Sequence, residues 1–176
     1  EREADVLRFA WQRHDHVSAE RFVSGPGLAL IHEALADRAG IALSSALAPS
    51  DVVARGLEGG DALCREAVDV FCGMLGTVAA NLAVTLGAQG GIYIGGGVVP
   101  RLGDYFASSP FRARFERKGR LSDFTARIPT FLITAPYPAL QGASRLLADY
   151  LADHLTDHPV RLRAVQASQE AADASC

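Results

Sequence analysis

The longest regular pattern of apolar residues covers residues 61–87. Apolar side chains recur there every three or four residues from Leu63 to Leu86, which is the spacing of one face of an α-helix. The pattern therefore predicts one long helix that is covered on more than one side. A stripe of small residues lies in the same segment and lets a backbone approach closely, and we expect this approach to be against a sheet. These small residues are Gly73, Gly76, Ala79, Ala80 and Ala83.

Shorter helices are expected before and after this segment. Ser18 is a suitable N-cap for a short helix that stops at Ser24-Gly25-Pro26-Gly27. The next helix is expected to begin at about Leu28, with Gly40 in a C-terminal capping position. Further helices are expected over residues 1–14, 49–57 and 139–152, and after Pro100.

Two short apolar runs predict strands, the first of them buried. Ile92–Ile94 lies between two glycine clusters, and residues 130–134 lie between Pro129 and Pro136. Many helices with few strands indicate an α/β fold, and we expect most of its sheet to lie before residue 1. The chain begins with Glu1 rather than Met, which favours a fragment or a processed chain.

Composition excludes several classes of protein. The 176 residues carry 17 Lys and Arg against 20 Asp and Glu, a net charge of −3, so direct nucleic-acid binding is not expected. No apolar run is expected to reach the roughly 20 residues of a membrane span. Cys64 and Cys72 lie about 12 Å apart along one helix, too far for a disulfide or a shared metal. We expect buried thiols in a reducing cytoplasm.

The triplet Gly95-Gly96-Gly97 directly follows the first predicted strand. Glycines at the carboxyl end of a strand allow a ligand to approach the backbone closely. A tight connection from strand to helix, with no ligand, explains the same pattern equally well.

Glu20 lies early in a short helix, just before a glycine–proline loop. An ionised carboxylate there can accept hydrogen bonds from sugar hydroxyls, although Glu is also favourable at a helix start for electrostatic reasons alone. His14 and His16 have no third ligand at helical spacing, so we interpret them as solvated turn residues. Phe111 and Phe115 are expected to be buried beneath a solvated basic face. We therefore predict no metal site, and these patterns by themselves identify no reaction.

Several stretches together resemble the bacterial glucokinase family, the ATP-dependent glucose kinases of the hexokinase-type, actin-like ATPase fold. The stretches are HVSAERFVSGPGL at 16–28, NLAVTLGAQGGIYIGGGVVPR at 81–101, FRARFERKGR at 111–120, and PTFLIT followed by PALQG near the end. The resemblance implies that residues 1–152 are the C-terminal part of a glucokinase large domain, helix-rich with few strands. Residues 153–176 are then an extension or a linker.

The resemblance also implies an activity, which is transfer of a phosphoryl group from ATP with Mg²⁺ to the 6-hydroxyl of glucose. Glu20 matches a family glutamate that binds glucose hydroxyls, and Gly95, Gly96 and Gly97 match a turn on the adenosine side of the nucleotide cleft. The family's catalytic aspartate, its two phosphate turns and a Glu-Gly-Gly-His sugar motif are absent from these 176 residues. We therefore name no catalytic residue and expect the chain to be inactive alone. A cytoplasmic homodimer is implied, and a fused regulatory domain after the tail is a further expectation.

Two other functions stay open. The chain is alternatively a non-catalytic sugar-binding module of a transcriptional regulator. A third interpretation is that the chain serves in subunit association, with exposed small-residue faces of the 61–87 helix at a subunit interface.

Overall fold

The computed structural model describes residues 2–154. The chain divides into two compact units, Glu1–Thr134 and Ala135–Cys176. The expected boundary at residue 152 between a kinase part and an extension stays a prediction. Nearly all of the 153–176 tail lies outside the described residues.

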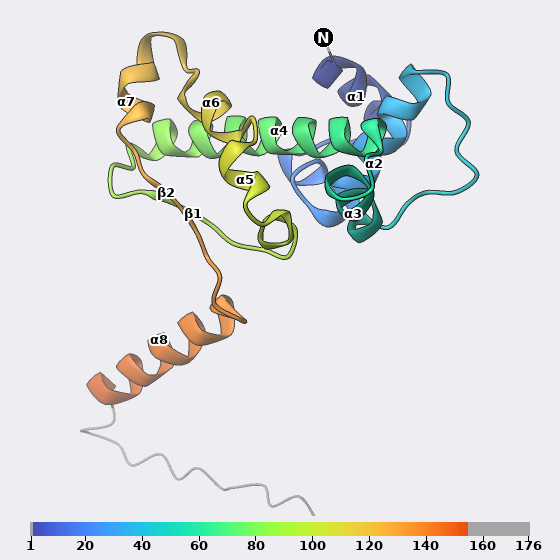
Figure 1. Cartoon of the computed structure of the whole chain (residues 1–176). Coiled ribbons are helices and arrows are strands. Elements are labelled where there is room, and N and C mark those ends of the chain that lie inside the picture. Colours follow the sequence, from blue (N-terminus) through green and yellow to red (C-terminus); the bar gives the residue numbers. More distant parts are fainter. Residues whose placement is uncertain (1, 155–176) are drawn as a thin grey trace, which may run out of the picture. The chain divides into compact units, whose positions relative to one another are not determined.

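Helix α4, Ala62–Leu86, runs through the first unit (Figure 1). Its first turn is capped by Asp61, whose carboxylate accepts hydrogen bonds from the N–H groups of Leu63 and Cys64, each at 3.0 Å. The helix ends at Gly87, which has a φ of 60° and adopts the left-handed conformation that glycine tolerates. The long helix predicted over 61–87 is therefore confirmed.

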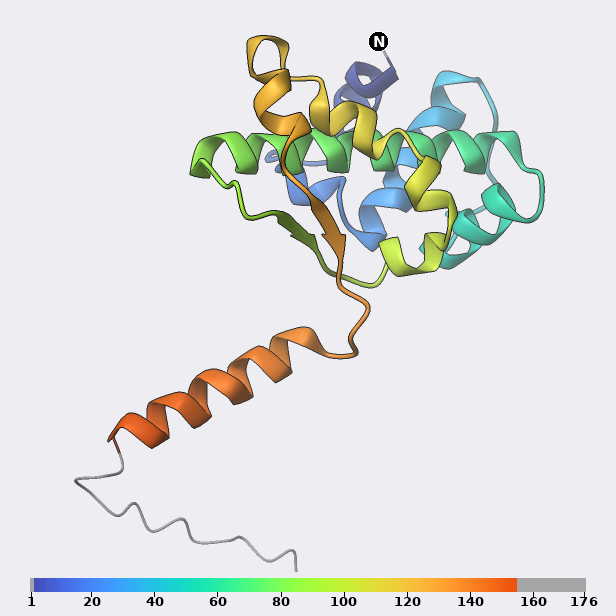
Figure 2. The same ribbon diagram turned by 60° about the vertical axis from the view of Figure 1, so that its left-hand side comes forward.

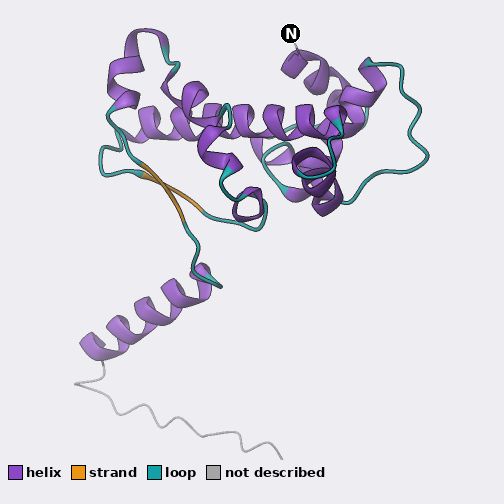
Figure 3. Ribbon diagram, in the orientation of Figure 1, coloured by secondary structure: helices purple, strands orange, loops and turns teal. Residues whose placement is uncertain are grey.

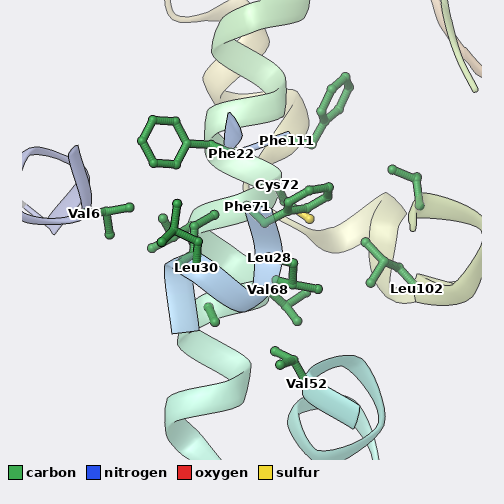
Figure 4. Packing of buried hydrophobic residues seen from close by; sticks show 14 of the residues in the cluster. Val6, Phe22, Leu28, Leu30, Val52, Val68, Phe71, Cys72, Leu102 and Phe111 are labelled. Carbon is green, nitrogen blue, oxygen red and sulfur yellow. The ribbon is translucent and has the colours of Figure 1, made fainter. Parts of the chain in front are cut away.

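Other helices of the first unit surround α4. Those that contact it include α1 (Arg2–Trp11), α2 (Gly25–Arg38), α3 (Pro49–Leu57), α6 (Phe111–Glu116) and α7 (Ser122–Ala126). The view in Figure 2 shows α6 lying along α4, as in Figure 1. Figure 4 shows Val68, Phe71 and Cys72 of α4 among side chains contributed by α2, α3 and α6. The main core is thus formed between helices.

The small residues of α4 are buried, and the two glycines among them lie against residues of helices rather than against a sheet. A Cβ atom at Gly76 would lie 2.4 Å from the carbonyl oxygen of Phe111 in α6. The predicted contact with a sheet is therefore wrong, because the spacing of small residues predicts a close approach but does not identify what approaches. The expectation that these small residues form an exposed face for a subunit contact is wrong for the same reason.

Helix α4 is also long and apolar enough to cross a membrane, judged by its length and composition alone. The expectation that no segment approaches this length therefore needs correction. Of its most apolar 18-residue stretch, 56% is buried inside the protein. Its apolar character is explained by its place at the centre of the helical core.

The start of α2 differs from the prediction in position and in form. The short helix expected from Ser18 is a single 3₁₀ turn, η1, Ala19–Arg21. Helix α2 already begins at Gly25, because the Ser24 hydroxyl accepts a hydrogen bond from the N–H of Gly27 at 3.1 Å. Gly25 and Pro26 were expected to break a helix, but they occupy its first turn, where the missing N–H of proline costs nothing.

Two short strands pair in parallel (Figure 3). Strand β1 is Ile92–Ile94 and strand β2 is Thr130–Leu132, with Ile92 opposite Thr130. The N–H of Ile133 extends the pairing by donating to the carbonyl oxygen of Ile94 at 2.8 Å. Both predicted strands are present, the second two residues shorter than expected. The predicted burial of the first strand is wrong, because Tyr93 at its centre is exposed and only Ile94 is fully buried. The crossover between them contains η2 (Val99–Leu102), α5 (Tyr105–Ser108), α6, η3 (Gly119–Leu121) and α7 (Ser122–Ala126).

The second unit contains helix α8, Pro138–His154. Its position confirms the helix expected over 139–152. Large apolar side chains of α8 are exposed within the described residues, among them Leu140, Leu146 and Tyr150.

The expected burial of two cysteines and two phenylalanines is also confirmed. Cys64 and Cys72 are buried free thiols, and burial raises the pKa of Cys64 to about 11 and that of Cys72 to about 12. Phe111 and Phe115 are buried on α6. Arg112 is not merely solvated, because its guanidinium donates to the carbonyl oxygens of Ile128 and Ala126, each at 2.8 Å.

Candidate functional site

Glu20 lies on η1, exposed to solvent, at the edge of a cavity of about 660 Å³. The cavity is formed by the segment before η1, by η1 itself and by α2 as far as Glu33. Its lining residues are His14, Ser18, Glu20, Arg21, Ser24, Pro26, Ala29, Leu30 and Glu33. We call this the Glu20 cavity.

One face of α2 forms a wall of the Glu20 cavity. Pro26, Ala29 and Glu33 follow one another at intervals of three and four residues, the spacing of a single helix face. The chain turns sharply between η1 and this face, since a Cβ at Gly27 would lie 2.3 Å from the carbonyl oxygen of Phe22 and 2.5 Å from that of Arg21. Glycine at position 27 therefore allows Glu20 to lie beside α2.

Several residues of this cavity were missed from the sequence. His14 was interpreted as a solvated turn residue, but it is half-buried and lines the Glu20 cavity. Glu33 raised no expectation, because no local pattern in the sequence relates it to Glu20. Within residues 2–154, no three His, Cys, Asp or Glu side chains come together in a way that holds a metal ion.

An ion pair holds Glu33 from the side of the first helix. Nη1 of Arg13 donates to Oε2 of Glu33 at 2.8 Å. The Arg13 guanidinium also lies 3.7 Å from the ring centroid of Phe9, a cation–π contact. These two contacts fix Arg13 between α1 and α2.

Next to Glu33 in the sequence, α2 carries a buried histidine that does not line the Glu20 cavity. His32 is 2% exposed, and its Nδ1 has no hydrogen-bond partner. Burial lowers the pKa of His32 below its usual value of 6.5, against the charges of Asp61 and Glu33, which act to raise it. His32 is therefore held neutral at pH 7.

The glycine triplet lies directly after β1 and is exposed. Gly96 has a φ of 124°, a conformation that other residues rarely adopt. A Cβ at Gly95 would lie 3.4 Å from Cδ1 of Ile133, in ordinary contact with the residue that follows β2. Gly97 is the member of the triplet that lines a hollow.

The hollow at Gly97 has a volume of about 300 Å³ and contains two helix starts. Gly25 is the first residue of α2, and Pro49 and Ser50 are the first two of α3. Arg101 lies in the same lining. Helix N-termini and a guanidinium both favour negative charge, so the hollow has the chemistry of an anion site beside a glycine turn.

The segment Ser24–Pro26 is shared by the Glu20 cavity and the Gly97 hollow. Ser24 and Pro26 line the first, and Gly25 between them lines the second. Residues that are 77 positions apart in the sequence, Glu20 and Gly97, are thus brought to two hollows around one helix start.

A third cavity, of about 700 Å³, contains none of the site residues expected from the sequence. Arg2, Arg38, Arg114 and Arg117 line it together with Glu3 and Asp69. Most of these guanidinium groups are paired: Arg114 with Glu3, Arg38 with Asp5, and Arg2 with Glu66. This cavity is lined by an ion-pair network that joins the helices.

Comparison with known families and proteins gives a consistent result. A family model described as glucokinase matches residues 1–150. The glucokinase of Chromobacterium violaceum is 56% identical over 160 residues, covering 91% of this chain and 46% of that protein. A protein named bifunctional protein glk, from Burkholderia thailandensis, is 56% identical over 153 residues, covering 87% of this chain and 24% of its own length.

A solved structure shares the fold. The crystal structure of glucokinase from an Antarctic psychrotroph superposes with a TM-score of 0.75 at 34% identity, covering 84% of this chain and 45% of that one. The chain thus spans about half the length of the relatives named glucokinase and about a quarter of the bifunctional one.

Proposed function

The chain belongs to the glucokinase family, and from this we propose that it forms part of an enzyme that transfers the γ-phosphoryl group of ATP to the 6-hydroxyl of glucose. The expected fold, the C-terminal part of an α/β glucokinase domain with many helices and few strands, is confirmed. Because the chain spans less than half of its glucokinase relatives, the activity, its substrates and its partners belong to the proposal.

Glucose is proposed to bind in the Glu20 cavity. A sugar presents hydroxyl donors in several directions, and an ionised carboxylate offers only acceptors. Glu20 has this chemistry at the edge of a cavity with further polar walls. The apolar side chains of Ala29 and Leu30 in the same lining suit the C–H surface of a sugar ring.

ATP is proposed to bind at the hollow lined by Gly97, with Gly95, Gly96 and Gly97 on the adenosine side. The starts of α2 and α3 and the Arg101 side chain give this hollow its preference for negative charge. We assign no ligand on this chain to Mg²⁺, which enters the proposal as the metal bound to the phosphates of ATP.

The observation that carries the proposal is the shared segment Ser24–Pro26. Phosphoryl transfer depends chiefly on positioning the two reactants and on stabilising charge. Two hollows around one helix start, one suited to a polyol and one to an anion, meet the first requirement. The family's catalytic base is not among these residues, so this chain's share is binding and orientation.

The proposal is tested with a coupled assay for glucose 6-phosphate on a form extended before residue 1, beside the 176-residue chain. Activity is expected only in the extended form. Glu20→Gln is expected to raise the KM for glucose by about 10- to 100-fold, because a charged hydrogen-bond acceptor is lost, with little change in the KM for ATP. Asp37→Asn, an exposed carboxylate later in α2, is the matched control. An unchanged KM for glucose in Glu20→Gln would refute the sugar site.

A sugar-binding module of a regulator is the second candidate. The relative named bifunctional protein glk, of which this chain covers 24%, shows that such a segment occurs within a much longer protein. This candidate predicts that the extended form binds glucose without turning it over.

We further propose a cytoplasmic location and a homodimer, each on the family resemblance. The small residues of α4 give the homodimer no support, because they are buried within the chain. Size-exclusion chromatography with light scattering on the extended form tests the dimer.

A further inference from the structure

We propose that Glu33 is a second carboxylate that contacts the sugar in the Glu20 cavity, and that Arg13 positions it. This inference rests on the proposed function of that cavity. It adds a specificity-determining residue and a positioning residue to the site.

The placement of Glu33 follows from the geometry of α2. Glu33 lies seven residues after Pro26, two helical turns along the same face, and both line the Glu20 cavity. Glu20 lines that cavity from η1. Two carboxylates from different elements therefore border one cavity of about 660 Å³, large enough for a monosaccharide between them.

Arg13 approaches Glu33 from another side. Arg13 and Glu33 both line a separate cavity of about 300 Å³, and Arg13 is absent from the Glu20 cavity lining. The hydrogen bond of 2.8 Å from Arg13 occupies Oε2 of Glu33. Oε1 has no donor among the residues that the structure describes. One oxygen of Glu33 is thus fixed by the protein, and the other is left as an acceptor.

The contact between Arg13 and Phe9 helps Arg13 to hold the Glu33 carboxylate in place. The guanidinium lies 3.7 Å from the ring centroid of Phe9, which is only 7% exposed. A cation–π contact with a buried ring limits the conformations of the long arginine side chain. Arg13 therefore holds Glu33 more firmly than an isolated ion pair at the surface would.

The ligand class is a polyol with several hydroxyl groups, here a monosaccharide. Each hydroxyl donates one hydrogen bond, and carboxylates at two sides of the cavity accept from different hydroxyls. A site that hydrogen-bonds a hydroxyl discriminates strongly against an analogue that lacks it. Glu20 and Glu33 are therefore expected to accept hydrogen bonds from different hydroxyl groups of the same sugar.

The test compares Glu33→Gln with wild type and with Asp37→Asn in the extended form. Asp37 lies one turn further along α2 and lines the Arg13 side, outside the Glu20 cavity. Glu33→Gln is expected to raise the KM for glucose about tenfold, leaving the KM for ATP unchanged. Across a series of deoxyglucoses, the variant is expected to lose discrimination against one analogue, different from the one affected in Glu20→Gln.

Arg13→Gln separates a positioning role from a structural one. Because Arg13 acts through Glu33, this variant is expected to affect the same deoxyglucose, by a smaller factor, and to add nothing in the double variant with Glu33→Gln. Fully additive effects, or an effect on all substrates alike, would overturn the positioning role.

The two proposals fail in distinguishable ways. If Glu20→Gln raises the KM for glucose and Glu33→Gln leaves it unchanged, this inference is wrong and the proposed sugar site stands. If neither variant changes it, both are wrong. If Glu33→Gln only lowers the free energy of unfolding, with selectivity among deoxyglucoses intact, Glu33 is structural and the inference is overturned.

Discussion

The Glu20 cavity and the Gly97 hollow share the segment Ser24–Pro26 but are built from different parts of the chain. The first is lined mainly by charged and polar side chains, together with Pro26, Ala29 and Leu30 of α2. The second is lined by a glycine turn, two helix starts and one arginine. One site therefore depends mainly on side-chain identity and the other mainly on backbone shape.

This difference determines which substitutions are informative. Replacing a carboxylate by its amide changes the first site and leaves its packing in place. In the second site, the corresponding change is to replace a glycine by alanine, which adds a Cβ to the turn. Adding a Cβ to a glycine needed for packing should lower the free energy of unfolding. Adding one to a glycine needed for ligand binding should instead weaken binding and leave stability almost unchanged.

The largest effect is expected for Gly27→Ala. The new Cβ would lie 2.3 Å from the carbonyl oxygen of Phe22, so η1 and α2 would have to move apart. We expect the free energy of unfolding to fall by about 3 kcal/mol, at the upper end for an overpacked site. Urea denaturation measures this. An unfolding curve equal to that of wild type would show that the two elements do not need this close contact.

Acid is expected to destabilise the packing of α2 around the buried His32. Burial lowers the pKa of His32, so the unfolded chain binds the proton more readily than the folded one. The contribution of neutral His32 to the free energy of unfolding is therefore fully present above pH 6.5 and is lost as the pH falls below that value.

His32→Leu is expected to flatten this loss of stability between pH 7 and pH 5. Unfolding curves collected across that range measure the slope, and His14→Gln is the control at a half-buried histidine. An equal slope in wild type and in His32→Leu would assign the acid sensitivity to other groups.

A smaller loss is expected for Ser24→Ala. The Ser24 hydroxyl accepts from the N–H of Gly27 at the start of α2, and loss of an N-cap costs about 1 kcal/mol. Because Ser24–Pro26 borders both hollows, the KM values for glucose and for ATP are both expected to rise. A rise in only one of them would show that the two sites are independent.

The smallest change in stability is expected for Gly97→Ala. No atom lies within 4 Å of the added Cβ, and the residue does not have a positive φ, so a change of less than about 0.5 kcal/mol is expected. The KM for ATP is nevertheless expected to rise, because the methyl group enters the proposed nucleotide hollow. Gly142→Ala, an open position on α8, is the control.

The sequence predicted those parts of the fold in which a strong local signal coincided with the final contacts. The apolar repeat over 61–87 and the glycine and proline residues around both strands belong to this class. The start of α2 was misplaced because Gly25 and Pro26 were interpreted as a break, although Ser24 and proline together are also typical of a helix start.

The candidate site was harder to predict because its residues come from separated segments. Glu20 and the glycine triplet were selected one at a time, and their roles stay predictions. Nothing local showed that His14 and Glu33 border the cavity of Glu20, or that Gly97 meets the starts of α2 and α3. Such groupings depend on the packing of α2 against the neighbouring elements.

The parallel pairing of β1 with β2 has a consequence for how the chain folds. Contacts between α3 and α4 join neighbours in the sequence, whereas Ile92 meets Thr130 only after a loop of more than 30 residues has closed. Closing such a loop costs entropy before any strand contact is gained. We therefore expect α3 and α4 to pack together early and the strand pair to form late, so the turn that carries Gly97 takes shape after the wall of the Gly97 hollow that the start of α3 contributes.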